Sequence, residues 1–152
     1  MHSLDRLPVA REDAPWLGAA LAAGLLAVTL YLATTPFPAY GAGLYLRIAD
    51  AIAAGGYAPP TRVSGYTADG VPFAYPPLQF YLLAVLLDLG AAPVALARLL
   101  PSVGVLAALV PAYLFTRDYA GSRPAGGAAG VAVALNPQLL QWHVSAGGVV
   151  RA

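Results

Sequence analysis

The chain has 152 residues, of which 59% are hydrophobic and 10% are charged, and its formal net charge is +1. Soluble domains usually carry about 25% charged residues, so this composition, with a mean hydropathy of +0.68, indicates a membrane protein. The nearly neutral charge argues against nucleic-acid binding, which needs a clustered basic surface. The absence of cysteine excludes disulfides, thiolate chemistry and cysteine-ligated zinc.

Residues 1–15 are polar with balanced charges, and we interpret them as an N-terminal tail. Residues 16–35 then form an uninterrupted apolar run. At about 1.5 Å per residue, this run covers the roughly 30 Å of a bilayer's hydrocarbon core and predicts the first transmembrane helix. A cleaved signal peptide is the alternative, but it should follow a clearly positive leader, whereas Glu12 and Asp13 stand next to this run.

We expect residues 36–74 to form a loop on the external side of the membrane. Prolines at its start end the first helix, because proline has no amide proton. Within the loop, residues 43–54 have the periodicity of an amphipathic helix, with apolar side chains on one face and Arg47 and Asp50 on another. A helix this short and polar is expected to lie along the membrane surface.

A tight turn is predicted at Asp69-Gly70, later in the same loop. Glycine tolerates the positive backbone angle that such a turn requires. The segment therefore predicts a small β-hairpin or an ordered loop.

Three further apolar segments follow, and we predict that each crosses the membrane. The helix over 75–90 begins at a Tyr-Pro-Pro step and carries Asp88 at the interface opposite to the loop. A carboxylate costs less there than the roughly 2.5–3.5 kcal/mol at the bilayer centre. Within the helix over 94–116, the apolar run 99–116 lies between Arg98 and Arg117, and the helix over 124–142 contains glycines that allow close helix packing. The predicted fold class is an all-α polytopic membrane protein with four transmembrane helices.

The arginines do not orient these helices. With four crossings and a cytoplasmic N-terminus, the arginines divide equally between the two sides, so the positive-inside rule is tied. If residues 75–98 were re-entrant instead, Arg117 and Arg123 would move to the inside. The chain also stops directly after an apolar segment, so we expect it to be the N-terminal part of a longer membrane protein.

The order of these features resembles one known family. The resemblance rests on a first helix, a loop with a surface helix, the YPPL step, a third helix that ends in an arginine-containing turn (ARLLPSVGVLAALVPAYLFTRDYAGSR) and a fourth that ends near a proline (VAVALNPQLLQWH). In these features the chain is similar to the N-terminal part of the GT-C superfamily of membrane glycosyltransferases. This group includes the protein mannosyltransferases and the lipid A aminoarabinose transferase. The resemblance covers residues 16 to about 145. It implies a multi-pass cell-membrane enzyme, surrounded by membrane lipid, that transfers a sugar from a polyprenyl-phosphate carrier to an acceptor at the outer face.

The resemblance also implies a site in the external loop, where an acidic residue acts as base and basic or hydroxyl groups hold the lipid phosphate. The family's position for the acid, in PFPAYGAGLY, has none here. Asp50 and Asp69 are the acids left in this loop and become the candidate catalytic residues. Arg47, Arg62 and Tyr75 are the candidate substrate-binding residues, since a guanidinium group can hold a phosphate. Each also has a structural explanation: an ion pair within a helix for Asp50 and Arg47, a turn for Asp69, contact with lipid headgroups for the arginines, and an interfacial aromatic anchor for Tyr75.

The missing acid leaves a second interpretation open, a non-enzymatic membrane protein of the same architecture, such as a carrier or an assembly partner. A carrier should have ionisable residues that face a cavity within its helices, and the apolar runs contain almost none. The two histidines and the scattered carboxylates lack metal-ligand spacing. No cofactor is evident, and a need for a divalent metal is not decided by these residues.

Overall fold

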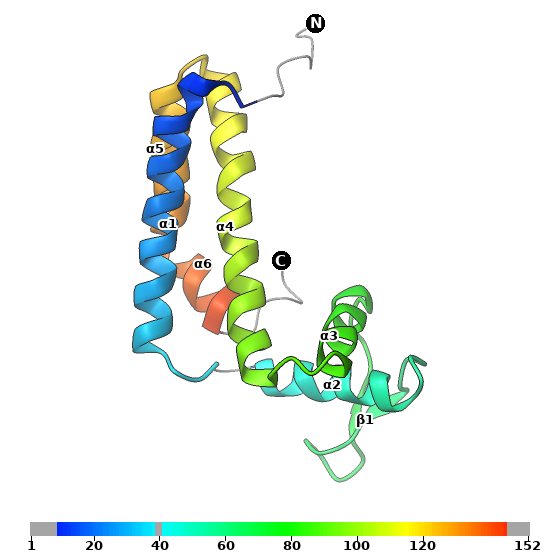
Figure 1. Ribbon diagram of the computed structural model, residues 1–152. Helices are drawn as coiled ribbons and strands as arrows, with labels where there is room; N and C mark the ends of the chain where they lie inside the picture. Colours follow the sequence, from blue (N-terminus) through cyan, green and yellow to red (C-terminus); the bar gives the residue numbers. More distant parts are fainter. Residues whose placement is uncertain (1–8, 39–40, 146–152) are drawn as a thin grey trace, which may run out of the picture. The chain divides into compact units, whose positions relative to one another are not determined.

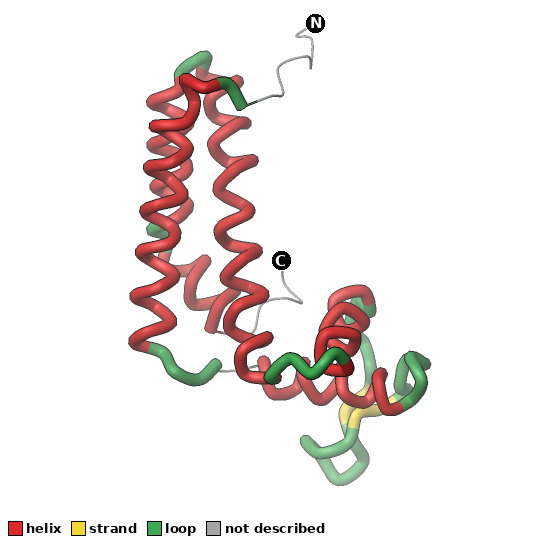
Figure 2. Tube along the Cα trace, viewed as in Figure 1, coloured by secondary structure: helices red, strands yellow, loops and turns green. Residues whose placement is uncertain are grey.

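The structure, a computed structural model, describes residues 9–38 and 41–145, and these are mostly helical, as expected (Figure 1). In chain order, a two-stranded antiparallel sheet stands between the second and third α-helices. Figure 2 shows its strands in yellow and the helices in red. The elements in chain order are η1 (Arg11–Asp13), α1 (Ala14–Thr34), α2 (Ala42–Ala54), β1 (Arg62–Val63), β2 (Val71–Pro72), α3 (Leu78–Asp88), α4 (Pro93–Ala120), α5 (Arg123–Ala134), α6 (Pro137–Leu139) and the π-helical turn η2 (Leu140–Ser145).

The chain divides into two compact units, each described by itself. The first contains residues up to 27 together with 106–136, so it holds the beginning of α1, the end of α4 and all of α5. The second contains residues 28–105 together with those from 137 onward. It holds the end of α1, the beginning of α4, and the α2, sheet and α3 segment.

Within the described residues, two helices are long and apolar enough to cross a membrane. They are the continuous helical segments Arg11–Thr34 and Pro93–Ala120, with 24 and 28 residues. In their most apolar stretches only 17% and 28% of the residues are buried within the protein. Much of their apolar surface therefore needs lipid or further protein to cover it.

The helices expected over 75–90 and 124–142 are shorter in the structure. α3 has 11 residues, about 16 Å of helix, and α5 has 12 residues, about 18 Å. α3 begins only after Pro77 and is followed by Gly90 with a φ of 86°, while α5 ends before Pro137. Neither helix alone reaches the roughly 30 Å of a hydrocarbon core.

Glycines bring α5 against α1 and α4 in the first unit (Figure 1). A Cβ atom on Gly130 would lie 2.6 Å from the Cβ of Ala20, and one on Gly126 would lie 2.9 Å from the carbonyl oxygen of Tyr113. Carbon atoms normally stay about 3.5–4.0 Å apart. The expected close packing at the glycines of this segment is confirmed.

The core of the second unit joins α2, β1 and α3. Its buried residues are Tyr45, Ile48, Ala49, Ile52, Val63, Phe80, Leu83 and Ala84. The amphipathic helix expected over 43–54 is present as α2, but Ile48 and Ile52 are only 1% and 0% exposed. Because α3 and β1 cover this apolar face, it is not available to a membrane surface.

The hairpin expected at Asp69-Gly70 is also present. Val63 pairs with Val71 across the two short strands, and Gly70 has a φ of 74°. A Cβ atom at position 70 would lie 2.9 Å from the Val63 carbonyl oxygen. The turn therefore requires glycine both for its backbone angle and for space.

The end of α1 lies against the beginning of α4 in the second unit. The guanidinium group of Arg98 donates hydrogen bonds to the carbonyl oxygens of Leu32 and Thr35. The last carbonyl groups of a helix have no partner within the helix. Arg98 supplies that partner from α4 and so holds the two helix ends together.

Candidate functional site

Asp50 and Arg47 lie on the exposed face of α2 and pair with each other. Nη1 of Arg47 is 3.3 Å from Oδ2 of Asp50, and the two side chains are 53% and 65% exposed. An exposed pair of this kind contributes little to stability, because water screens both charges. The arrangement leaves the Asp50 carboxylate open to water beside a guanidinium group.

Arg62 binds the turn that carries Asp69. Its Nε donates to the carbonyl oxygen of Asp69 at 2.6 Å, and its Nη2 donates to that of Gly70 at 3.0 Å. The Thr67 hydroxyl also donates to the Gly70 carbonyl, at 2.9 Å. Arg62 thus holds the turn closed with two of its donors, and the Asp69 residue is exposed.

The loop between β1 and β2 approaches the polar side of α2. The Tyr66 hydroxyl oxygen lies 2.8 Å from where a Cβ atom on Gly43 would be, and Nε of Arg47 lies 3.9 Å from where a Cβ atom on Gly65 would be. Glycine at position 43 leaves room for that hydroxyl group. Arg47, Asp50 and Tyr66 therefore share one polar surface, which we call the α2–loop face.

Tyr75 belongs to the aromatic core instead. Its ring packs edge-on against Tyr45 and Phe80, with centroids 5.8 Å apart in each pair. Phe73 packs on Phe80 in the same way, also at 5.8 Å. Edge-to-face contacts of this kind are favourable for aromatic rings, so Tyr75 fixes the Tyr-Pro-Pro step onto the core of the second unit.

A third acid in this segment, Asp88, contacts a residue that the sequence did not single out. The Tyr57 hydroxyl donates to Oδ2 of Asp88 at 2.6 Å, and this bond, with some burial of the hydroxyl, raises the pKa of Tyr57. Tyr57 has a φ of 66°, which is uncommon for a side chain of this size. Asp88 was expected at the interface opposite to the loop. That expectation is wrong, because Tyr57 lies in the loop itself.

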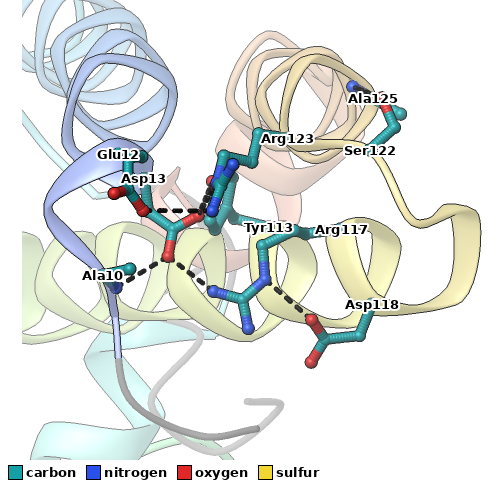
Figure 3. A network of polar contacts seen from close by, with 9 residues as sticks. All are labelled: Ala10, Glu12, Asp13, Tyr113, Arg117, Asp118, Ser122, Arg123 and Ala125. Atoms are coloured by element: carbon teal, nitrogen blue, oxygen red, sulfur yellow. Dashed lines mark hydrogen bonds and ion pairs between the residues drawn. The ribbon is translucent and has the colours of Figure 1, made fainter.

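A polar network in the first unit surrounds Asp13 (Figure 3). This carboxylate is 1% exposed. It accepts hydrogen bonds from the Tyr113 hydroxyl at 2.7 Å, from Nη1 of Arg117 at 2.6 Å and from the backbone amide of Ala10 at 2.8 Å. Nε of Arg123 is 3.3 Å away. The two guanidinium groups compensate the loss of water around a buried charge.

Residues 1–15 were expected to form a polar tail, and the end of that segment is helical. Arg11–Asp13 form a helical turn that leads directly into α1; residues 1–8 lie outside the described part. Two signals could have located the network. Asp13 stands three residues after Ala10 and bonds back to its amide, as in half of a capping box. Tyr113 and Arg117 are four apart and share one face of a helix.

The structure thus pairs each candidate acid with a candidate arginine, and the two pairs use different atoms of the acid. Asp50 meets the side chain of Arg47, whereas Asp69 meets Arg62 through its backbone carbonyl. Tyr75 joins neither pair through the contacts described above. Within residues 9–38 and 41–145, no three metal-ligating side chains come together. Comparison with protein-family models, curated proteins and solved structures finds no match to this chain.

Proposed function

We propose that the chain is the N-terminal membrane region of a GT-C-type enzyme that transfers a sugar from a polyprenyl phosphate at the outer face of the cell membrane. In this proposal α1 and α4 cross the membrane, and residues 36–92 form a cap on the outer side. The observation that carries it is the order of the sequence features, above all the YPPL step that follows a loop with an amphipathic helix.

The contacts of Asp13 support two crossings rather than three up to residue 120. Asp13 precedes α1 and binds Arg117 near the end of α4, so in this proposal these two helix ends lie on the same side of the membrane. The four-crossing arrangement has three crossings before residue 117 and would put them on opposite sides. With two crossings the re-entrant alternative applies. Among the seven arginines up to residue 123, a cytoplasmic N-terminus then puts Arg6, Arg11, Arg117 and Arg123 inside, against Arg47, Arg62 and Arg98 outside, and the positive-inside rule favours this orientation.

The cap contains the groups that such a transfer needs. The acceptor oxygen bonds to the anomeric carbon, the bond from that carbon to the phosphate oxygen breaks, and the phosphate leaves with the electron pair. A guanidinium group stabilises this leaving group, and a carboxylate takes the acceptor's proton. Arg47 and Asp50 lie within 3.3 Å of each other. Donor phosphate binding to Arg47 would release the Asp50 carboxylate to act as the base.

The test uses the full-length protein in liposomes with a polyprenyl-phosphate sugar and measures sugar transfer. Asp50→Asn or Asp69→Asn should lower kcat by about 100-fold or more, as for loss of a general base, while donor binding persists. Asp118→Asn, on the opposite side in the two-crossing arrangement, is the control and should retain activity. Full activity in both the Asp50→Asn and the Asp69→Asn variants would mean that neither acid is the catalytic base.

A non-enzymatic protein of the same architecture is the second candidate. It is favoured by the lack of an acid in PFPAYGAGLY and by the exposure of Asp50 and Asp69. In this case the full-length protein should bind polyprenyl phosphate without transferring sugar. The same liposome assay, run beside a binding measurement with a fluorescent polyprenyl phosphate, separates the two candidates.

A further inference from the structure

α3 has two apolar faces, and the residues that the structure describes cover one of them. Phe80, Leu83 and Ala84 point into the core of the second unit and are 0%, 2% and 0% exposed. On the other side of the helix four residues form an exposed stripe, which we call the α3 stripe: Leu78, Leu82, Val85 and Leu89, with exposures of 76%, 47%, 42% and 78%. Their spacing of four, three and four residues places them on one narrow line along the helix.

α2 is built the opposite way. Its apolar face is buried against α3 and β1, and its free face carries Arg47 and Asp50. In this two-helix arrangement α2 is polar on the outside, whereas α3 is apolar on the outside. A row of four exposed aliphatic side chains without a charge is unusual on a surface that faces water.

The connection to α4 indicates what covers the α3 stripe. Only residues 89–92 separate α3 from α4, and four residues reach at most about 14 Å even when fully extended. The first turns of α4 expose Val94, Leu99 and Val103 to 44%, 56% and 62%. If α4 crosses the bilayer, α3 is held beside the point where it enters.

The backbone at both ends of α3 suits an apolar environment. At the C-terminal end, the amide of Ala91 donates to the carbonyl of Leu86 at 3.0 Å and that of Gly90 donates to Leu87 at 2.9 Å, which is the hydrogen-bonding pattern of a Schellman cap. At the other end, Pro76 and Pro77 have no amide protons to satisfy. Both features reduce the number of free backbone groups at the helix ends, and lipid tolerates few such groups.

We propose that α3 lies in the plane of the membrane and that the α3 stripe inserts among the acyl chains at the surface of the outer leaflet. α3, and not α2, is then the membrane-surface helix of the cap. An in-plane helix needs one apolar face rather than the length of a span. The α2–loop face belongs to the helix packed on the water side of α3. This inference rests on the membrane crossings of the proposed function and is independent of sugar transfer.

The test exploits the absence of cysteine from this chain. Spin labels are attached to single cysteines in the full-length protein, after any cysteine beyond residue 152 is replaced, and the protein is reconstituted in phosphatidylcholine and phosphatidylglycerol liposomes. The positions are Leu78→Cys, Leu82→Cys, Val85→Cys and Leu89→Cys, with Asp50→Cys as the aqueous control. Collision rates with oxygen, which concentrates in lipid, are compared with those of a water-soluble nickel chelate.

We expect oxygen collisions to exceed nickel collisions at all four stripe positions, at similar shallow depths, with the reverse at Asp50→Cys. Equal nickel access at the stripe and at Asp50→Cys overturns the inference. Protection from both reagents overturns it too, because protein would then cover the stripe. A depth that runs from one interface at position 78 to the other at position 89 would make α3 a crossing helix and also contradict it.

A label at Leu26→Cys separates failure of this inference from failure of the proposed function. Leu26 is 61% exposed in the middle of α1 and should lie deep in lipid if α1 crosses the membrane. An aqueous label there would contradict the membrane crossings themselves. A deep label at Leu26→Cys together with an aqueous α3 stripe would overturn only the in-plane position of α3.

Discussion

The Tyr113 hydroxyl donates a 2.7 Å hydrogen bond to Oδ1 of Asp13, a residue 100 positions earlier in the chain. This bond joins α4 to the start of α1 at a point where both side chains are buried, 0% and 1% exposed. It makes the two long helices run in opposite directions within the first unit. The side-by-side position of the helices there depends on this carboxylate and on the glycines of α5.

Replacing the buried carboxylate should destabilise the first unit. Asp13→Asn keeps the size of the side chain but leaves the Arg117 guanidinium, 2.6 Å away, without its buried counter-ion, and breaking a buried pair is costly. We expect the melting temperature in detergent to fall by several degrees. Glu12→Gln is the matched control, because Glu12 is 70% exposed and pairs with the half-exposed Arg123. Equal melting temperatures for the two variants would contradict the structural role of Asp13.

The glycine contacts of α5 predict different effects for one kind of substitution. Gly130→Ala places a Cβ atom 2.6 Å from that of Ala20, and overpacking of this kind costs about 1–3 kcal/mol. Gly18→Ala, in α1, meets nothing within 4 Å and should be neutral or stabilise by roughly 0.5–1 kcal/mol, because alanine favours a helix. Thermal unfolding of the two variants in the same detergent measures the difference. If Gly130→Ala is as stable as Gly18→Ala, the close approach of α5 to α1 is wrong.

The Tyr57–Asp88 contact predicts a dependence of stability on alkaline pH. Tyr57 has its pKa raised above the ordinary 10.0, since its neutral hydroxyl donates to Asp88. A raised pKa contributes stability that is fully present below the unfolded value and is lost as pH rises through the folded value. Tyr57→Phe should therefore lower the melting temperature near neutral pH, and the difference from wild type should shrink above about pH 10. A difference that stays constant across this range would rule out the hydrogen bond as its cause.

Local signals in the sequence predicted much of the secondary structure. The apolar run before Pro36 predicted a helix over 16–35, and the observed helix is Ala14–Thr34. The turn predicted at Asp69-Gly70 is also present. These features depend on neighbouring residues, so a single sequence carries them. α3 is shorter than expected because the Tyr-Pro-Pro step precedes the helix, and the expected 124–142 segment is interrupted at Asn136-Pro137 because proline cannot continue the helical hydrogen bonding.

The contacts between distant segments were not predictable in this way. The sequence pattern of α2 is the same whether lipid or protein covers its apolar face. It therefore could not predict that α3 packs on Ile48 and Ile52. The partners of Asp13 are likewise far along the chain. The roles of Asp50 and Asp69 stay predictions, since the structure gives their positions and neighbours but not their chemistry.

The most direct measurement asks on which side of the membrane two exposed tyrosines lie. Tyr66, in the cap, is 52% exposed, and Tyr119, at the end of α4, is 86% exposed. Each is replaced by cysteine in the full-length protein, otherwise free of cysteine, and intact cells are treated with a membrane-impermeant maleimide. We expect Tyr66→Cys to react in intact cells and Tyr119→Cys to react only after permeabilisation. Reaction of both positions from the same side would contradict the account, because α4 would then not cross the membrane or a second segment between position 66 and α4 would cross as well.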